Sequence, residues 1–135
     1  YAFIGGGTNN SVTDDQGTIG GGTSNVIAGQ AAFIGGGDSN FASGVKSTVS
    51  GGFGNTASGT TSTVCGGTSN QATNTSTSVG GGTSNVASAA HASIGGGNSN
   101  IENSEYLAGK SVRCNEPGES NQIEIDCVKH QLDRH

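Results

Sequence analysis

The chain has 135 residues, of which 26 are glycine, one is proline and none is methionine or tryptophan, and its formal net charge is −5. It has only five lysine and arginine residues and so lacks the clustered positive charge that binds nucleic acid; no apolar run of about 18 residues is present to span a membrane. Scrambled, this composition, only 30% hydrophobic, would be typical of a flexible linker.

The order of the residues argues against a linker, because a unit of fifteen residues returns seven times without an insertion. When its fifteen columns are numbered from Tyr1, column 4 is always isoleucine or valine, columns 6 and 7 are always glycine, and column 10 is always asparagine. A fixed period of this kind is typical of a solenoid. The predicted structural core is column 4, made of Ile4, Ile19, Ile34, Val49, Val64, Val79 and Ile94.

Two short strands per unit are predicted, in chain order around column 4 and over columns 10 to 13. A helix is excluded, because adjacent glycines each cost about 1 kcal/mol in a helix interior and the apolar residues are too sparse for a helical stripe. Alternation along the first strand turns columns 2 and 4 to one face and columns 3 and 5 to the other. Glycines supply the corners, so each unit becomes one coil of an all-β parallel solenoid, or β-roll.

The asparagine column predicts a ladder along the solenoid axis, because a side-chain amide both donates and accepts hydrogen bonds and neighbouring coils are one strand spacing apart. The alternative is that asparagine serves only as a turn residue, since it tolerates the left-handed conformation. The predicted ladder residues are Asn10, Asn25, Asn40, Asn55, Asn70, Asn85 and Asn100.

The repeat is predicted to end near residue 105, which divides the chain into a solenoid over 1–105 and a cap over 106–135. The period fails there, because the next column-4 position is Gly109, and 11 of the 15 charged residues lie between Glu102 and Arg134. Strands are predicted over 110–114 and 122–128, with a Pro-Gly turn between them. Such a hairpin brings Cys114 close to Cys127; a disulfide and two buried thiols remain alternatives.

Candidate chemistry is sparse, and the sequence predicts no catalytic, cofactor-binding or metal-binding residues. The Gly109-Lys110-Ser111 run lacks the earlier glycine of a phosphate loop, since Ser104 is in that place. Asp14 and Asp15 are expected in a solvated turn, because calcium solenoids need an aspartate in every repeat. His91 and Cys65 are expected to be an exposed histidine and an inert small residue, while His130 and His135 have poor chelate spacing.

A homo-oligomer is expected, because only one bulky apolar side chain per coil is guaranteed and a lone thin solenoid buries little apolar surface. Its open sheet edges also invite pairing with another chain.

The stretch Thr48-Val49-Ser50-Gly51-Gly52, followed by Ala57-Ser58-Gly59, resembles the head repeats of YadA-like trimeric autotransporter adhesins. The resemblance covers residues 1 to about 105. It implies a left-handed parallel β-roll, three chains around one axis, and display on a surface. The family repeat is typically one residue shorter and its neck motif is not recognisable here. Similar repeats occur in viral and phage fibres.

These observations predict a non-enzymatic structural or adhesive segment of a fibre on a cell or virion surface, outside the cell, that binds a host glycan or protein through its outer face. A virus or phage fibre subunit is one alternative. A second is an ice-binding solenoid, because Thr18, Thr48 and Thr63 form a partial row in column 3. Phe3 and Phe33 interrupt that row.

Overall fold

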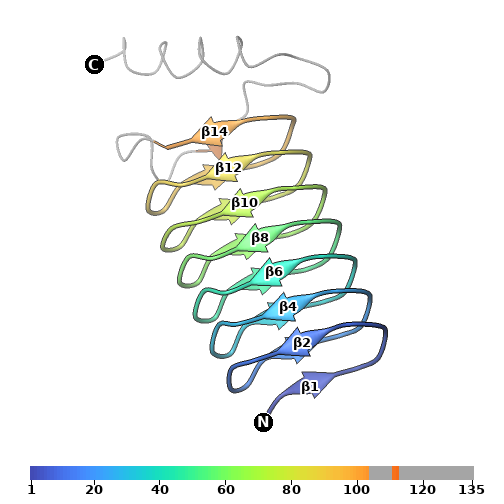
Figure 1. The fold of residues 1–135 in the computed structure, drawn as a ribbon. Helices are drawn as coiled ribbons and strands as arrows, with labels where there is room; N and C mark the ends of the chain where they lie inside the picture. The colour runs from blue at the N-terminus through green and yellow to red at the C-terminus, as the bar shows by residue number, and fades with distance from the viewer. Residues whose placement is uncertain (104–110, 113–135) are drawn as a thin grey trace, which may run out of the picture.

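The computed structural model describes residues 1–103 and the backbone of 111–112, and these residues form a parallel β-solenoid of about seven fifteen-residue coils (Figure 1). This part of the chain is all-β and contains no helix. Within it, therefore, nothing helical is long and apolar enough to cross a membrane.

Each coil contributes two strands of two residues, one to each of two sheets. The first sheet holds the strands of columns 3 and 4: β1 (Phe3–Ile4), β3 (Thr18–Ile19), β5 (Phe33–Ile34), β7 (Thr48–Val49), β9 (Thr63–Val64), β11 (Ser78–Val79), β13 (Ser93–Ile94) and β15 (Ser111–Val112). The second holds those of columns 11 and 12: β2 (Ser11–Val12), β4 (Val26–Ile27), β6 (Phe41–Ala42), β8 (Thr56–Ala57), β10 (Gln71–Ala72), β12 (Val86–Ala87) and β14 (Ile101–Glu102).

All strand pairs are parallel, and from β1 to β14 each residue pairs with the residue fifteen positions later, as Phe3 does with Thr18. A third row of single β-bridges joins column 8 of successive coils, from Thr8–Thr23 to Thr83–Asn98. The same chemical groups therefore lie directly above one another along the whole stack, which keeps every column straight.

The first sheet continues past the predicted boundary at residue 105. β15 pairs in parallel with β13, Ser93 opposite Ser111 and Ile94 opposite Val112, an offset of eighteen residues. The residue that follows Ile94 in the column-4 row is thus Val112 and not Gly109. Because the chain between them is three residues longer than in the other units, a fixed fifteen-residue period does not find this strand. The second strand of the predicted hairpin, over 122–128, lies outside the described residues.

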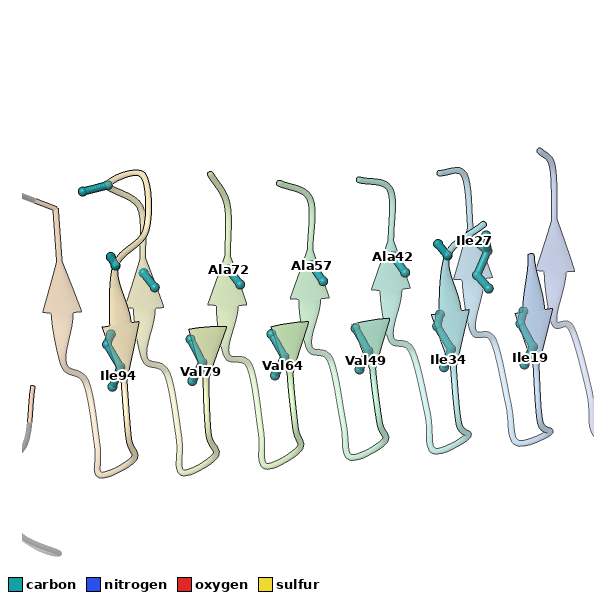
Figure 2. Close-up of a cluster of buried hydrophobic side chains, with 14 residues drawn as sticks. Ile19, Ile27, Ile34, Ala42, Val49, Ala57, Val64, Ala72, Val79 and Ile94 are labelled. Carbon is teal, nitrogen blue, oxygen red and sulfur yellow. The ribbon is translucent and has the colours of Figure 1, made fainter. Parts of the chain in front are cut away.

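The core lies between the two sheets, where column 4 of one faces column 12 of the other (Figure 2). Column 12 is mostly alanine, so the two sheets approach closely and a single isoleucine or valine per coil fills the space between them. Side chains of column 2 complete this interior and are small in every coil.

In the first two coils the core is filled by larger side chains in column 12, and the column-2 residue between them is correspondingly smaller. Val12 and Ile27 occupy column 12 there, and Gly17 lies between them in column 2. A β-carbon on Gly17 would lie 2.6 Å from Cγ1 of Val12 and 2.8 Å from Cγ2 of Ile27. The larger column-12 residues therefore require glycine in column 2 at this place.

Two corners of each coil are made by residues in the left-handed conformation, and these are mostly not glycine. Twelve non-glycine residues, all in column 1 or column 9, have φ between 56° and 65°. The conformation turns the peptide N–H toward the preceding coil: Ala31 N donates to Asp15 O at 2.9 Å, whereas Thr18 N in the strand donates forward to Ala32 O at 3.1 Å. From Ser24 onward, the backbone N–H groups at these corners are therefore hydrogen-bonded to the neighbouring coil and are not left unpaired.

Column 7 needs glycine for two reasons. Gly52, for example, has φ of 93°, and a β-carbon there would lie 2.3 Å from the carbonyl oxygen of Gly67 in the next coil and 2.6 Å from Nδ2 of Asn55. The third corner is therefore tied to the asparagine column beside it.

Candidate functional site

The asparagine side chains point into the solenoid and hydrogen-bond at each coil. From Asn25 to Asn100 they are buried, while Asn10 in the first coil is half-buried. None has positive φ, because the left-handed residue is the one before it, in column 9. Their role is therefore not that of a left-handed turn residue.

Asn55 shows the pattern of the ladder. Its Nδ2 donates to Gly51 O and to Gly67 O, both at 2.9 Å, and its Oδ1 accepts the backbone N–H of Asn70 at 2.9 Å. The chain of bonds along the axis runs chiefly from amide oxygen to backbone N–H. Direct amide-to-amide bonds of 3.1–3.2 Å are added at three steps, donated by Asn25, Asn40 and Asn85.

The predicted core residues Ile19, Ile34, Val49, Val64, Val79 and Ile94 are almost completely buried. Ile4 is different, with 43% of its surface exposed. It lies in the first coil, where Ile19 covers only one side of it. Core and ladder together hold the scaffold and leave the outward columns to meet other molecules.

Three outward rows of side chains run along the solenoid, in columns 3, 8 and 11. Column 3 holds Phe3, Thr18, Phe33, Thr48, Thr63, Ser78 and Ser93; column 8 holds Thr8, Thr23, Asp38, Phe53, Thr68, Thr83 and Asn98; column 11 holds Ser11, Val26, Phe41, Thr56, Gln71, Val86 and Ile101. Columns 3 and 11 contain no charged residue. Both broad sheet faces are thus neutral surfaces of hydroxyl, aliphatic and aromatic groups.

Apart from one acidic pair near the amino terminus, the exposed charged residues of the described coils are single. Asp14 and Asp15 are exposed at a corner, where Asp14 Oδ1 accepts the N–H of Asp15 and Asp15 lies 3.7 Å from the amino terminus. Lys46 and His91 are exposed in column 1 of different coils. Among residues 1–103 no three histidine, cysteine or acidic side chains gather as metal ligands would.

The predicted sulfur chemistry falls mostly outside the described residues. Cys65 is exposed and has a free thiol in column 5. Cys114, Cys127, His130 and His135 lie beyond the described part of the chain, so their predicted roles stay predictions.

A pair of phenylalanine rings on the first sheet is the feature that sequence reasoning undervalued. Phe3 and Phe33 are 59% and 41% exposed. Cε1 of Phe3 lies 3.4 Å from where a β-carbon on Gly5 would be, and Cε1 of Phe33 lies 3.5 Å from that position on Gly35. Both rings therefore extend over the glycine two residues later. The signal was present as Phe-x-Gly in the first and third units, but was interpreted only as an interruption of a threonine row.

Glu102 is the first of the charged residues that gather toward the C-terminus, and the structure places it in β14, 1% exposed, in column 12. It stands where the four preceding coils have alanine. Its column number was the available signal.

Comparison of the sequence with protein-family models and with curated proteins finds no match.

Proposed function

We propose that this chain is a non-enzymatic structural and adhesive segment of a surface-displayed fibre. The observation that carries the proposal is the in-register stack: every outward column forms a straight row over about seven coils, on a scaffold closed by backbone hydrogen bonds and the asparagine ladder. A rigid scaffold that repeats the same small surface many times is better suited to binding an extended partner than to catalysis at a single site.

The location follows from the same proposal: the segment works outside the cell, on a cell or virion surface. The resemblance to YadA-like adhesin heads supports a cell-surface fibre, and the likeness of such repeats to viral and phage fibres supports the alternative owner. The partners proposed are glycans or proteins on a host or other surface.

The proposed assembly is a homotrimer with parallel axes, in which the second sheet turns toward the common axis. Column 11 supports this choice, because it is the outward row richest in apolar side chains, including Val26, Phe41, Val86 and Ile101. Phe41 and Ile101 are 39% and 48% exposed in the single chain. Association through this row would remove them from water and cover a neutral face.

Light scattering tests the assembly. The expected mass is about three times 13.1 kDa, and Phe41→Glu is expected to shift it toward the monomer by placing a charge in the apolar row. Phe53→Glu, in column 8, is the matched control and is expected to leave the mass unchanged. A monomeric wild-type chain would overturn the trimer.

Adhesion is tested separately, by the binding of the chain to arrays of glycans and surface proteins. Retention on a defined class of ligand is expected. Turnover of any arrayed ligand, or no retention on any surface by a correctly folded chain, would contradict the adhesive function.

An ice-binding solenoid is the second candidate, favoured by one observation. Column 3 carries a hydroxyl in four successive coils, at Thr48, Thr63, Ser78 and Ser93, spaced by one strand separation of about 4.8 Å. Thermal hysteresis of the purified chain would support this function, and its loss in Thr63→Val would assign it to this row.

A further inference from the structure

We infer that Phe3 and Phe33, with Thr18 between them, form a binding platform for a neutral β-1,4-linked polysaccharide that lies along the solenoid axis. The inference rests on the proposed function, because it names the ligand class of the face that stays outward when column 11 turns toward the trimer axis. The platform is defined as Phe3, Thr18 and Phe33 in column 3 with Gly5, Gly20 and Gly35 in column 5.

The two rings are presented in the same way. Each extends over the column-5 glycine of its own coil, with nearly equal approaches of 3.4 Å and 3.5 Å to the would-be β-carbon, and each is substantially exposed. Because the two strands are related by the regular register of the sheet, both rings project from the same sheet face. Two exposed rings on one sheet face offer a stacking surface and not a pocket.

The spacing of the rings follows from the coils. Phe3 pairs with Thr18 and Thr18 with Phe33, so the rings lie two coils apart, about 10 Å along the axis. That separation matches the disaccharide repeat of an extended β-1,4-linked chain. Alternate sugars in such a chain turn the same face to the surface, so both rings would meet equivalent faces of the ligand.

The chemistry of the platform fits a sugar better than a protein or a charged polymer. The flat faces of a β-linked pyranose are rows of C–H bonds, which carry partial positive charge and favour the electron-rich face of an aromatic ring. The Thr18 hydroxyl, half-buried between the rings, can donate to and accept from a sugar hydroxyl. Columns 3 and 5 contain no charged side chain, which suits a neutral ligand.

The glycines provide the space that a polymer needs. Gly5 and Gly35 leave the space over column 5 that the rings of Phe3 and Phe33 occupy, and Gly20 leaves it open between them. The next two coils carry Ser50 and Cys65 in this column, so the glycines mark the first three coils as a stretch of the column without side chains. A continuous chain that crosses the three coils therefore meets only the two rings over this column.

The test uses the full chain and measures its retention on insoluble β-1,4-glucan and chitin, with soluble oligosaccharides of the same linkage as competitors. Binding to at least one of these β-1,4 polymers, and none to an α-linked glucan, is expected. Phe3→Ala and Phe33→Ala are each expected to weaken binding about tenfold. Phe53→Ala, which removes a 53% exposed ring from column 8, is expected to change nothing.

A second variant tests the spacing and not merely the number of rings. In Thr18→Phe combined with Phe33→Thr, two rings remain in column 3 but lie one coil apart, and each position carries a residue that the column already accepts. Binding is expected to fall as far as in the single alanine variants, while circular dichroism and the unfolding midpoint stay close to those of the wild type.

The outcomes separate the ligand from the broader function. Retention that is insensitive to ring spacing, or equally weakened by Phe53→Ala, overturns the platform. A chain that binds surface proteins or other glycans but no β-1,4 polymer also overturns the platform, yet leaves the adhesive function standing. Self-association abolished by Phe33→Ala would assign the rings to contact between copies of the chain and overturn the inference.

Discussion

The asparagine side chain does more for this fold than any other single residue type. Asn55 satisfies the carbonyls of Gly51 and Gly67 and the N–H of Asn70, three backbone groups in two coils. Gly67 O also accepts the N–H of Phe53, but the N–H of the buried Asn70 depends on Asn55, and a buried group left without a partner costs about 1–3 kcal/mol.

We therefore expect Asn55→Ala to lower the free energy of unfolding by about 1–3 kcal/mol, measured by urea denaturation followed by circular dichroism. Gln71→Ala is the matched control, because its amide is exposed on the outer face in column 11. A loss below about 0.5 kcal/mol in Asn55→Ala would contradict the structural role of the ladder.

Column 2 offers a second test at the residue scale. Substitutions at two of its positions are expected to change the free energy of unfolding in opposite directions. The buried Ser62 hydroxyl has no hydrogen-bond partner, whereas the Thr77 hydroxyl in the same column donates to Asn74 O at 2.8 Å. Ser62→Ala is expected to raise the free energy of unfolding by about 1 kcal/mol, and Thr77→Val to lower it by a similar amount. Ala32 and Ala92 show that the column accepts alanine. Thermal unfolding of the two variants side by side would reveal the sign of each change.

At the scale of the coil, the left-handed corners show where hydrogen bonds between coils override the conformational preference of single residues. An L-residue in this conformation costs about 1–2 kcal/mol, yet columns 1 and 9 hold serine, alanine, threonine and even histidine there. From Ser24 onward the cost is offset because the conformation turns the N–H of the corner toward a carbonyl of the preceding coil.

Replacing Ala31 by glycine is expected to raise the free energy of unfolding by about 0.5–1 kcal/mol, since glycine adopts φ of 56° without strain. Ala28→Gly, at an outward position of ordinary φ in column 13, is expected to lower it by a similar amount because glycine loses more chain entropy on folding. Chemical denaturation that gives both variants the same sign would contradict the strain at the corner.

The strand positions themselves were accessible to sequence reasoning. The branched residue of column 4 and the mixed residues of columns 10 to 13 predicted two strands per coil, and the structure places them over columns 3–4 and 11–12. β15 lies within the strand predicted over 110–114 and pairs in parallel with β13 of the first sheet, while its predicted hairpin partner over 122–128 lies outside the described residues. Fixed-period reasoning cannot follow a link that is three residues longer than the others.

At the scale of the whole molecule, the stack predicts that coils are interchangeable units, because the named strands pair only with the next coil on either side. Deleting residues 61–75, one complete unit, should give a shorter protein with the same β spectrum and a lower unfolding midpoint. Deleting only residues 61–67 shifts every later residue seven columns and places polar side chains inside, so it should abolish folding. A seven-residue deletion that folds normally would contradict the assigned register.

The same regularity explains why the candidate platform was harder to predict than the scaffold. Phe3 and Phe33 belong to a variable column, and in the sequence they stand thirty residues apart with no local sign that they act together. Only the parallel register places them on one face, two coils apart, each over a bare glycine.

The sequence by itself determined the repeat, the all-β parallel solenoid, the two strands per coil and the identity of the columns that point inward. This was possible because the same residue types recur in the same columns of seven units, and every unit must satisfy the same backbone geometry. The tertiary structure alone decided which partner each asparagine atom takes, which non-glycine residues adopt left-handed corners, and how the sheet passes to β15. These depend on the carbonyls and N–H groups that the neighbouring coil presents, and that information lies fifteen or more residues away along the chain.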